Sequence, residues 1–182
     1  MKTYSEREKG CEDAFQSGGP YWHAYTSGKD TPLLFVNDSD FKFAMNAVAQ
    51  AASMYPEITI LAFEIMGNHF HFVIAAEQDD IDNFWRYLSK KLSRRYRNLK
   101  LTSLSIKRID NLNSLRNNIV YTNRNGYVAD SSYTPFSYPW GTGRYYFRLE
   151  RLKVKSRLTT EDSYSSAELR NCHWNGLPSM IL

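Results

Sequence analysis

The run from Met66 to Ile74, MGNHFHFVI, most constrains the fold of this chain. It is apolar except near two histidines, His69 and His71, which are separated by a single residue. Successive side chains of a β-strand point to opposite faces, so the two histidines share one face while Phe70 and Phe72 share the other. We therefore predict a strand with one face for packing and one that presents two imidazoles.

A His-x-His pair alone has two interpretations. Two imidazoles side by side on a rigid strand can bind a divalent metal and leave positions open for a substrate. Alternatively, both histidines are structural and have ordinary hydrogen-bond partners, since the pattern is short and histidine serves many purposes. Other parts of the chain have to decide between these readings.

The remaining elements are predicted from residue type and periodicity. Strands are indicated by β-branched and aromatic residues at 21–26, at 58–63 and, more weakly, at 101–109. The strand at 58–63 is expected to pair antiparallel with the histidine strand. Helices are indicated at 39–54 after a cap at Asn37 or Asp38, from Asp79 into a basic run, and at 112–124, where Gly126 is expected to end the helix.

The chain of 182 residues is long enough for one principal domain with a core. Residues 1–19 are polar and end in a Ser-Gly-Gly-Pro run, which predicts a flexible entry segment before a domain at 20–147. Residues 127–146 are rich in aromatics, Ser, Pro and Gly and predict an ordered loop packed by its own rings. Residues 148–182 form a basic C-terminal extension.

Charge and cysteine usage bear on partner and compartment. Lys and Arg number 23 against 19 Asp and Glu, and the pI is about 9.0, which favours a polyanionic partner. Two distant cysteines, Cys11 and Cys172, favour a reduced compartment. The charged N-terminus is unlike a signal peptide and no run is apolar enough to span a membrane, so we expect a cytoplasmic protein without a membrane partner.

A dense positive cluster follows the predicted helix that opens at Asp79. Its cations are Lys90, Lys91, Arg94, Arg95, Arg97 and Lys100. Such a run is either a solvated helix face or a contact for a nucleic-acid backbone, in which case Tyr96 is available to stack on a base.

One tyrosine lies away from the apolar stripe of the predicted helix at 112–124. At about 100° per residue, Leu115 and Ile119 cluster with Leu112, whereas Tyr121 points about 180° away from Leu112. Asn125, four positions later, projects near Tyr121 if the helix continues. Taken alone, a tyrosine in a chain with 13 of them is most often structural.

Together, the segment Gly67–Phe72 and the downstream Tyr121-Thr-Asn-Arg-Asn125 resemble the two motifs of the HUH single-tyrosine transposases. This family includes insertion-sequence enzymes and relatives associated with repetitive extragenic palindromes. The order and separation of the motifs match across residues 21–147. Many relatives carry Pro where Gly67 and Gly126 stand here, and both exchanges are compatible with turns.

The resemblance implies an α+β fold that is ferredoxin-like or RRM-like, with a central antiparallel sheet and helices on one face. It implies that His69 and His71 bind Mg²⁺ or Mn²⁺, with Asn125 as a third ligand. It implies that Tyr121 attacks a phosphate in single-stranded or hairpin-forming DNA, giving a 5′-phosphotyrosine link for strand transfer. A tyrosine of ordinary pKa about 10 needs such help to act as a nucleophile.

Three alternatives remain at the level of sequence. The chain is a transposase, a non-catalytic protein that binds single-stranded nucleic acid with its sheet, or a domesticated relative that nicks DNA without mobilising an element. A homodimer is also open, because within the family the tyrosine helix serves either its own site or a partner's.

Overall fold

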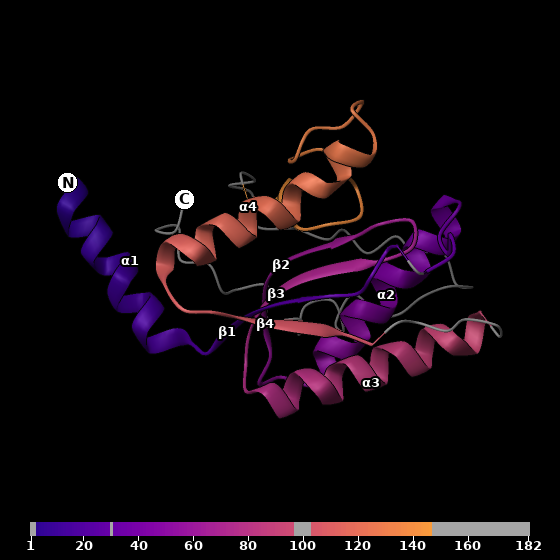
Figure 1. Ribbon diagram of the computed structural model, residues 1–182, viewed down its shortest axis with the longest axis horizontal. Coiled ribbons are helices and arrows are strands. Elements are labelled where there is room, and N and C mark those ends of the chain that lie inside the picture. The colour runs from indigo at the N-terminus through magenta and orange to yellow at the C-terminus, as the bar shows by residue number, and fades with distance from the viewer. Residues whose placement is uncertain (1–2, 30, 97–102, 147–182) are drawn as a thin grey trace, which may run out of the picture.

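A computed structural model describes residues 3–29, 31–96 and 103–146 (Figure 1). Within them, four antiparallel strands form one sheet in the order β2-β3-β1-β4. The strands are β1 (Tyr21–Tyr25), β2 (Thr59–Ile65), β3 (Phe70–Ala75) and β4 (Ser105–Ile109). The helices are α1 (Tyr4–Gly18), α2 (Asp38–Met54), α3 (Gln78–Arg95), α4 (Leu112–Ala129) and the short 3₁₀ helix η1 (Gly143–Tyr145). The predicted extension at 148–182 lies outside the described residues.

One face of the sheet is covered by α2 and α3, as the alternation of the histidine strand requires. Phe70, Phe72 and Ile74 of β3 are fully buried in a core shared with both helices. Helix α2 begins after Asn37, whose side chain accepts a hydrogen bond from the Asp40 N–H at 3.1 Å. The expected α+β fold and the antiparallel pairing of β2 with β3 are confirmed.

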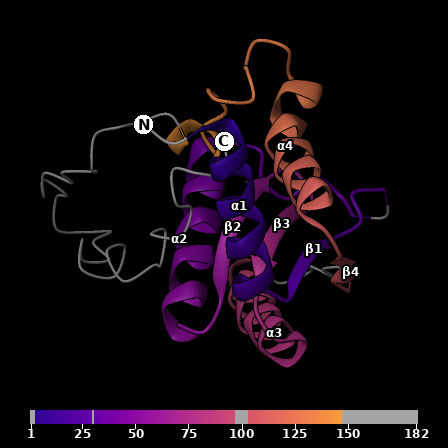
Figure 2. The same ribbon diagram turned by 90° about the vertical axis from the view of Figure 1, so that its left-hand side faces the viewer.

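Helices lie on both faces of the sheet, which corrects the expectation that they lie on one. Val73 and Ala75 of β3 point away from the first core and are buried in a second one, against Leu115 of α4 and Phe15 of α1. Figures 1 and 2 show α4 on the opposite side of the strands from α2 and α3. The physical reason is that the part of the second face around Val73 and Ala75 is also apolar, so its burial by helices is favourable.

The segment predicted to be flexible at 1–19 contains the helix α1, which corrects that prediction. Thr3 and Glu6 form a reciprocal capping box at its start. Two apolar residues four positions apart, Cys11 and Phe15, are buried in the second core, and the Phe15 ring stacks on Tyr21 at 4.9 Å. Two apolar positions in a polar segment are a weak sequence signal for a helix. They can nevertheless pack the helix against the apolar surface of the second core.

Helix α4 was predicted to end at Gly126, but it continues to Ala129. Gly126 is buried, and a Cβ at this position would overlap the Tyr138 ring. The glycine therefore permits close packing between α4 and the loop that follows it, rather than a helix stop.

This packing predicts opposite effects for two glycine substitutions. Gly126→Ala is expected to lower the free energy of unfolding by roughly 1–3 kcal/mol, because the added methyl meets the Tyr138 ring. Gly10→Ala in α1 is expected to raise it by roughly 0.5–1 kcal/mol, because nothing lies within 4 Å of its Cβ position and alanine favours the helix. Urea denaturation of both variants measures this, and destabilisation of equal size in both would contradict the packing argument.

The loop after α4 is ordered by its own aromatic residues, as predicted. The Tyr138 hydroxyl donates a hydrogen bond to the Ile65 carbonyl at 2.9 Å. The rings of Tyr133 and Tyr138 pack in a T-shaped arrangement, with their centroids 5.4 Å apart. The loop then runs along the free edge of β2, where Ile65 N–H donates to the Trp140 carbonyl and Thr142 N–H to the Phe63 carbonyl, each at 2.9 Å. The loop thereby covers the β2 edge of the sheet. No helix among the described residues is long and apolar enough to cross a membrane.

Candidate active site

The two histidines of the opening motif lie side by side on the α4 side of the sheet. His71 belongs to β3 and His69 directly precedes it. Their ring centroids are 5.0 Å apart and the rings are nearly perpendicular. Phe70 and Phe72 point into the opposite core, so the predicted division of the strand into a packing face and an imidazole face is confirmed.

Tyr121 of α4 lies over this imidazole face within the same chain. Its ring is nearly perpendicular to the rings of His71 and His23, at centroid distances of 5.6 and 5.7 Å. The side chain is 48% exposed, whereas Leu115 and Ile119 on the apolar stripe of α4 are buried. The structure therefore brings Tyr121 to the histidines while leaving it open to a ligand from solvent.

His23 of β1 is a third histidine at the site, and sequence reasoning missed it. Its Nε2 lies 3.3 Å from Nδ1 of His71, and the two rings are stacked at 5.5 Å. Tyr25, on the same face of β1, packs against both histidines. Alternation along 21–25 predicts that His23 and Tyr25 share a face. Their position beside β3 depends on the order of the strands in the sheet, which the residues around 21–25 do not predict.

The three imidazoles favour the neutral form. Burial, together with the neighbouring His69 and His23, lowers the pKa of His71 to about 3. Burial also lowers the pKa of His69, and burial together with the charge of Lys107 lowers that of His23. Neutral imidazole is the form that binds metals, so the site is competent for coordination at neutral pH.

The hydrogen bonds of His69 fix which ring nitrogen is available. The Asn68 amide nitrogen donates to the carbonyls of Gly28 and Thr31 at 2.7 and 2.8 Å, so its oxygen is the atom facing His69. That oxygen lies 2.8 Å from His69 Nδ1, which must therefore carry the proton. The lone pair is then on Nε2. Orientation by a bond to the other ring nitrogen is the usual support for a metal-binding histidine.

The described residues contain no group of three or more His, Cys, Asp or Glu side chains arranged to hold a metal ion. His69 and His71 supply two nitrogen ligands, and Mg²⁺ or Mn²⁺ would need oxygen atoms besides. Phosphate and water are the sources of oxygen that suit such a partial site. The donor set thus fits a cation bound together with a phosphate substrate.

Asn125, the expected third ligand, lies one helical turn beyond Tyr121. Its amide nitrogen donates to the carbonyls of Tyr121 and Thr122 at 3.0 and 3.2 Å, within α4 itself. Its amide oxygen is the atom that would coordinate a hard cation. A role for Asn125 as a ligand stays a prediction.

Glu64 of β2 is a second residue that sequence reasoning missed. It stands opposite His71 in the β2–β3 register and is only 1% exposed. Its Oε2 accepts a hydrogen bond from the Gly126 N–H at 3.1 Å. Burial raises the pKa of Glu64 to about 7, although the backbone N–H groups of Gly126 and Asn125 act in the opposite direction. The carboxyl thus joins β2 to the helical turn that carries Tyr121 and Asn125.

The basic run at the end of α3 lies on the other side of the sheet from Tyr121. Lys90 and Arg94 are exposed and Lys91 is half-buried, while Arg97 lies outside the described residues. Arg95 is not a free cation, because it packs over the Phe43 ring at 4.7 Å and lies 3.6 Å from Asp40. Contacts of this run with DNA stay a prediction.

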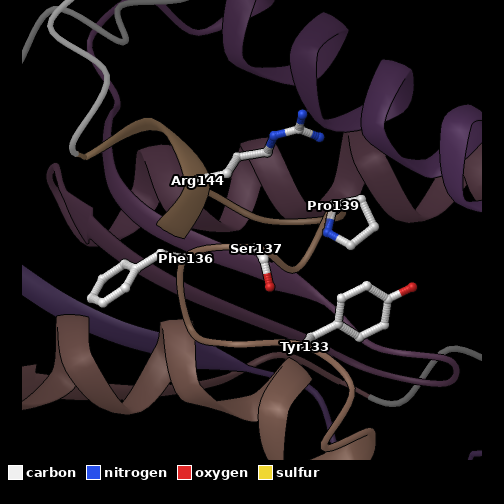
Figure 3. Close-up of a pocket in the computed structure, with 5 residues that line it drawn as sticks. All are labelled: Tyr133, Phe136, Ser137, Pro139 and Arg144. Atoms are coloured by element: carbon white, nitrogen blue, oxygen red, sulfur yellow. The ribbon is translucent and has the colours of Figure 1, made fainter.

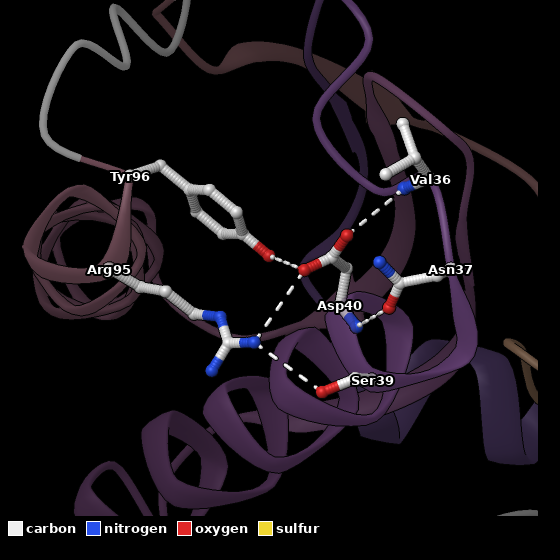
Figure 4. Close-up of polar contacts among 6 residues, drawn as sticks. All are labelled: Val36, Asn37, Ser39, Asp40, Arg95 and Tyr96. Atoms are coloured by element: carbon white, nitrogen blue, oxygen red, sulfur yellow. Dashed lines mark hydrogen bonds and ion pairs between the residues drawn. The ribbon is translucent and has the colours of Figure 1, made fainter.

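Tyr96 is engaged within the chain, which corrects the expectation that its ring is available to a base (Figure 4). Its hydroxyl donates to Asp40 Oδ1 at 3.0 Å, and its ring packs edge-on against Phe35 and Phe43. Burial and the Asp40 carboxylate raise the pKa of Tyr96 to about 12. Together with Arg95, this residue joins the end of α3 to the start of α2.

A separate hollow of about 420 Å³ lies in the loop after α4 (Figure 3). The residues that line it are Tyr133, Phe136, Ser137, Pro139 and Arg144. None of them belongs to the histidine and tyrosine cluster, so the hollow and the candidate active site are distinct.

Comparison with known proteins supports the fold. No protein-family model matches the chain, and no curated protein matches it by sequence. A solved structure of a REP-associated tyrosine transposase bound to a REP hairpin matches with a TM-score of 0.58 at 16% identity, over 70% of this chain and 78% of that one. At this identity the match establishes a shared fold.

Proposed function

We propose that this chain is an HUH single-tyrosine enzyme that cleaves and transfers single-stranded DNA. The observation that carries the proposal is the contact of Tyr121 with His71 in one chain, on a fold shared with a tyrosine transposase. In this proposal Tyr121 is the nucleophile, His69 and His71 are metal ligands, and Asn125 is the third ligand. Because the tyrosine faces histidines of its own chain, the site needs no residue from a second copy.

The reaction is a transesterification at one phosphodiester. The Tyr121 hydroxyl oxygen forms a bond to phosphorus, and the bond from phosphorus to the 3′ oxygen breaks. The phenolic proton passes by way of water to the departing 3′ oxygen. The products are a 5′-phosphotyrosine link and a free 3′-hydroxyl. The covalent link preserves the energy of the phosphodiester, so the reverse attack by a 3′-hydroxyl rejoins a strand without ATP.

His69 and His71 would hold Mg²⁺ or Mn²⁺ through their Nε2 atoms, and the bound cation would stabilise negative charge on the phosphate oxygens. His23 holds the His71 ring from its Nδ1 side, and Asn68 does the same for His69. These contacts keep both rings in place before the substrate arrives, which limits the reorganisation needed at the reaction step.

The alternative function is a non-catalytic protein that binds single-stranded nucleic acid with the open part of its sheet. The half-exposed Tyr121 and the exposed cations of α3 are compatible with it. It differs from the enzyme in one respect, because it requires neither a metal nor a covalent bond.

A covalent adduct decides between the two functions. The full chain is incubated with a labelled single strand flanked by a hairpin, with Mn²⁺ or with EDTA, and resolved under denaturing conditions. We expect a protein–DNA band that requires Mn²⁺ and that is lost in His69→Ala, whose side chain is only partly buried. Binding of the strand with no adduct in either Mn²⁺ or Mg²⁺ would support the non-catalytic alternative instead.

A further inference from the structure

Part of the imidazole face is left open beside α4. The helix packs over β2 and β3, whereas β4 is the strand at the opposite edge of the sheet (Figure 1). Three side chains of the neighbouring strands β1 and β4 lie on this same face, namely Tyr25, Ser105 and Lys107. Ser105 and Lys107 are exposed and Tyr25 is half-buried, so this surface is accessible from solvent.

The register places Lys107 beside the candidate nucleophile. Lys107 stands directly opposite His23, and side chains in such pairs have Cβ atoms about 5 Å apart. The His23 ring in turn contacts the rings of Tyr121 and His71. Lys107 is therefore separated from Tyr121 by a single side chain.

Lys107 places a cationic side chain on the exposed part of this face. The Glu64 carboxyl on the same face is buried beneath α4, whereas Lys107 is exposed. The long lysine stem lets the ammonium reach an anion placed over the strand. The anion that the proposed substrate supplies at regular intervals is the backbone phosphate.

The next residue along β4 provides a natural contrast. Arg108 points to the opposite face, where its guanidinium lies over the Trp22 ring at 5.4 Å and 3.6 Å from Asp110. Two adjacent cations of the same strand thus lie on different faces of the sheet, and only Lys107 is on the face of Tyr121.

We propose that Tyr25, Ser105 and Lys107 form a subsite for the substrate strand, in which the Lys107 ammonium binds the phosphate adjacent to the scissile one. The adjacent phosphate is the one assigned, because His23 separates Lys107 from Tyr121 and His71. This inference rests on the proposed function, since it takes single-stranded DNA as the ligand. A phosphate contact carries no sequence information, so it contributes equally to all sequences.

The test measures binding of a labelled single strand of mixed sequence to the full chain carrying Tyr121→Phe, in EDTA, over a range of salt concentrations. Lys107→Gln is expected to weaken binding roughly three- to tenfold at low salt and to make the slope of log affinity against log salt shallower by about 0.7. Arg108→Gln removes the same charge from the same strand and is expected to change neither quantity. Lys107→Arg should retain most of the affinity.

The outcomes separate this inference from the proposed function. Equal losses in Lys107→Gln and Arg108→Gln, or no loss in either, overturn the subsite. So does a loss in Lys107→Arg as large as that in Lys107→Gln. In these cases the proposed function still stands if the unsubstituted chain forms the Mn²⁺-dependent adduct. A chain that neither binds single strands nor forms the adduct overturns both.

Discussion

Tyr121→Phe is expected to abolish the covalent DNA adduct and to lower strand cleavage by about 10³-fold or more. Phenylalanine keeps the ring that packs against His23 and His71 but lacks the oxygen that bonds to phosphorus. The Tyr121 side chain is 48% exposed, so the thermal midpoint of unfolding should change little. Affinity for the uncleaved strand should also stay close to that of the unsubstituted chain, because the loss is confined to the reaction step.

Tyr127 supplies the matched control for this substitution. It lies on the same helix and is 46% exposed, almost as much as Tyr121, but makes no ring contact with the histidines among the described residues. Tyr127→Phe is expected to form the adduct at the normal rate. An adduct that persists in Tyr121→Phe and disappears in Tyr127→Phe would transfer the nucleophile's role to Tyr127 and refute the assignment.

The parts of the site that follow from local periodicity are the parts that the sequence predicts. Alternation along β3 places His69 and His71 on one face, and the helical angle places Tyr121 off the apolar stripe of α4. Each of these relations needs only a few neighbouring residues and one element of known geometry. The fold class follows in the same way from the order of strands and helices.

The parts that sequence reasoning missed depend on which elements meet in space. His23 is next to His71 because β1 pairs with β3, and Glu64 is beneath α4 because β2 pairs with β3 from the other side. Tyr96 is held within the chain because Asp40, 56 residues away in the sequence, accepts a hydrogen bond from its hydroxyl. Each of these contacts joins residues of different strands or different helices. The periodicity of a single element therefore cannot predict it.

Glu64 is expected to make the stability of the chain depend on pH in a way that a single substitution removes. Burial raises the pKa of its carboxyl to about 7, against 4.5 for an exposed glutamate. The folded state therefore prefers the protonated form. The contribution of Glu64 to stability is complete below pH 4.5 and is lost as the pH rises through about 7. The full difference amounts to about 3 kcal/mol.

Glu64→Gln tests this expectation, because glutamine keeps an oxygen for the Gly126 N–H and cannot ionise. Relative to the unsubstituted chain, the variant should gain stability as the pH rises from about 5 to about 8, by up to about 3 kcal/mol, in urea denaturation without metal. Glu57→Gln, which changes an exposed carboxylate just before β2, should show no such gain.

Glu64→Ala, which leaves the Gly126 N–H without its acceptor and opens a cavity, should lower the free energy of unfolding by roughly 3 kcal/mol or more at low pH. A stability difference between Glu64→Gln and the unsubstituted chain that is constant with pH would show that Glu64 is ionised in the folded state. The turn of α4 that carries Tyr121 would then be held to β2 by a buried carboxylate rather than by a neutral acid.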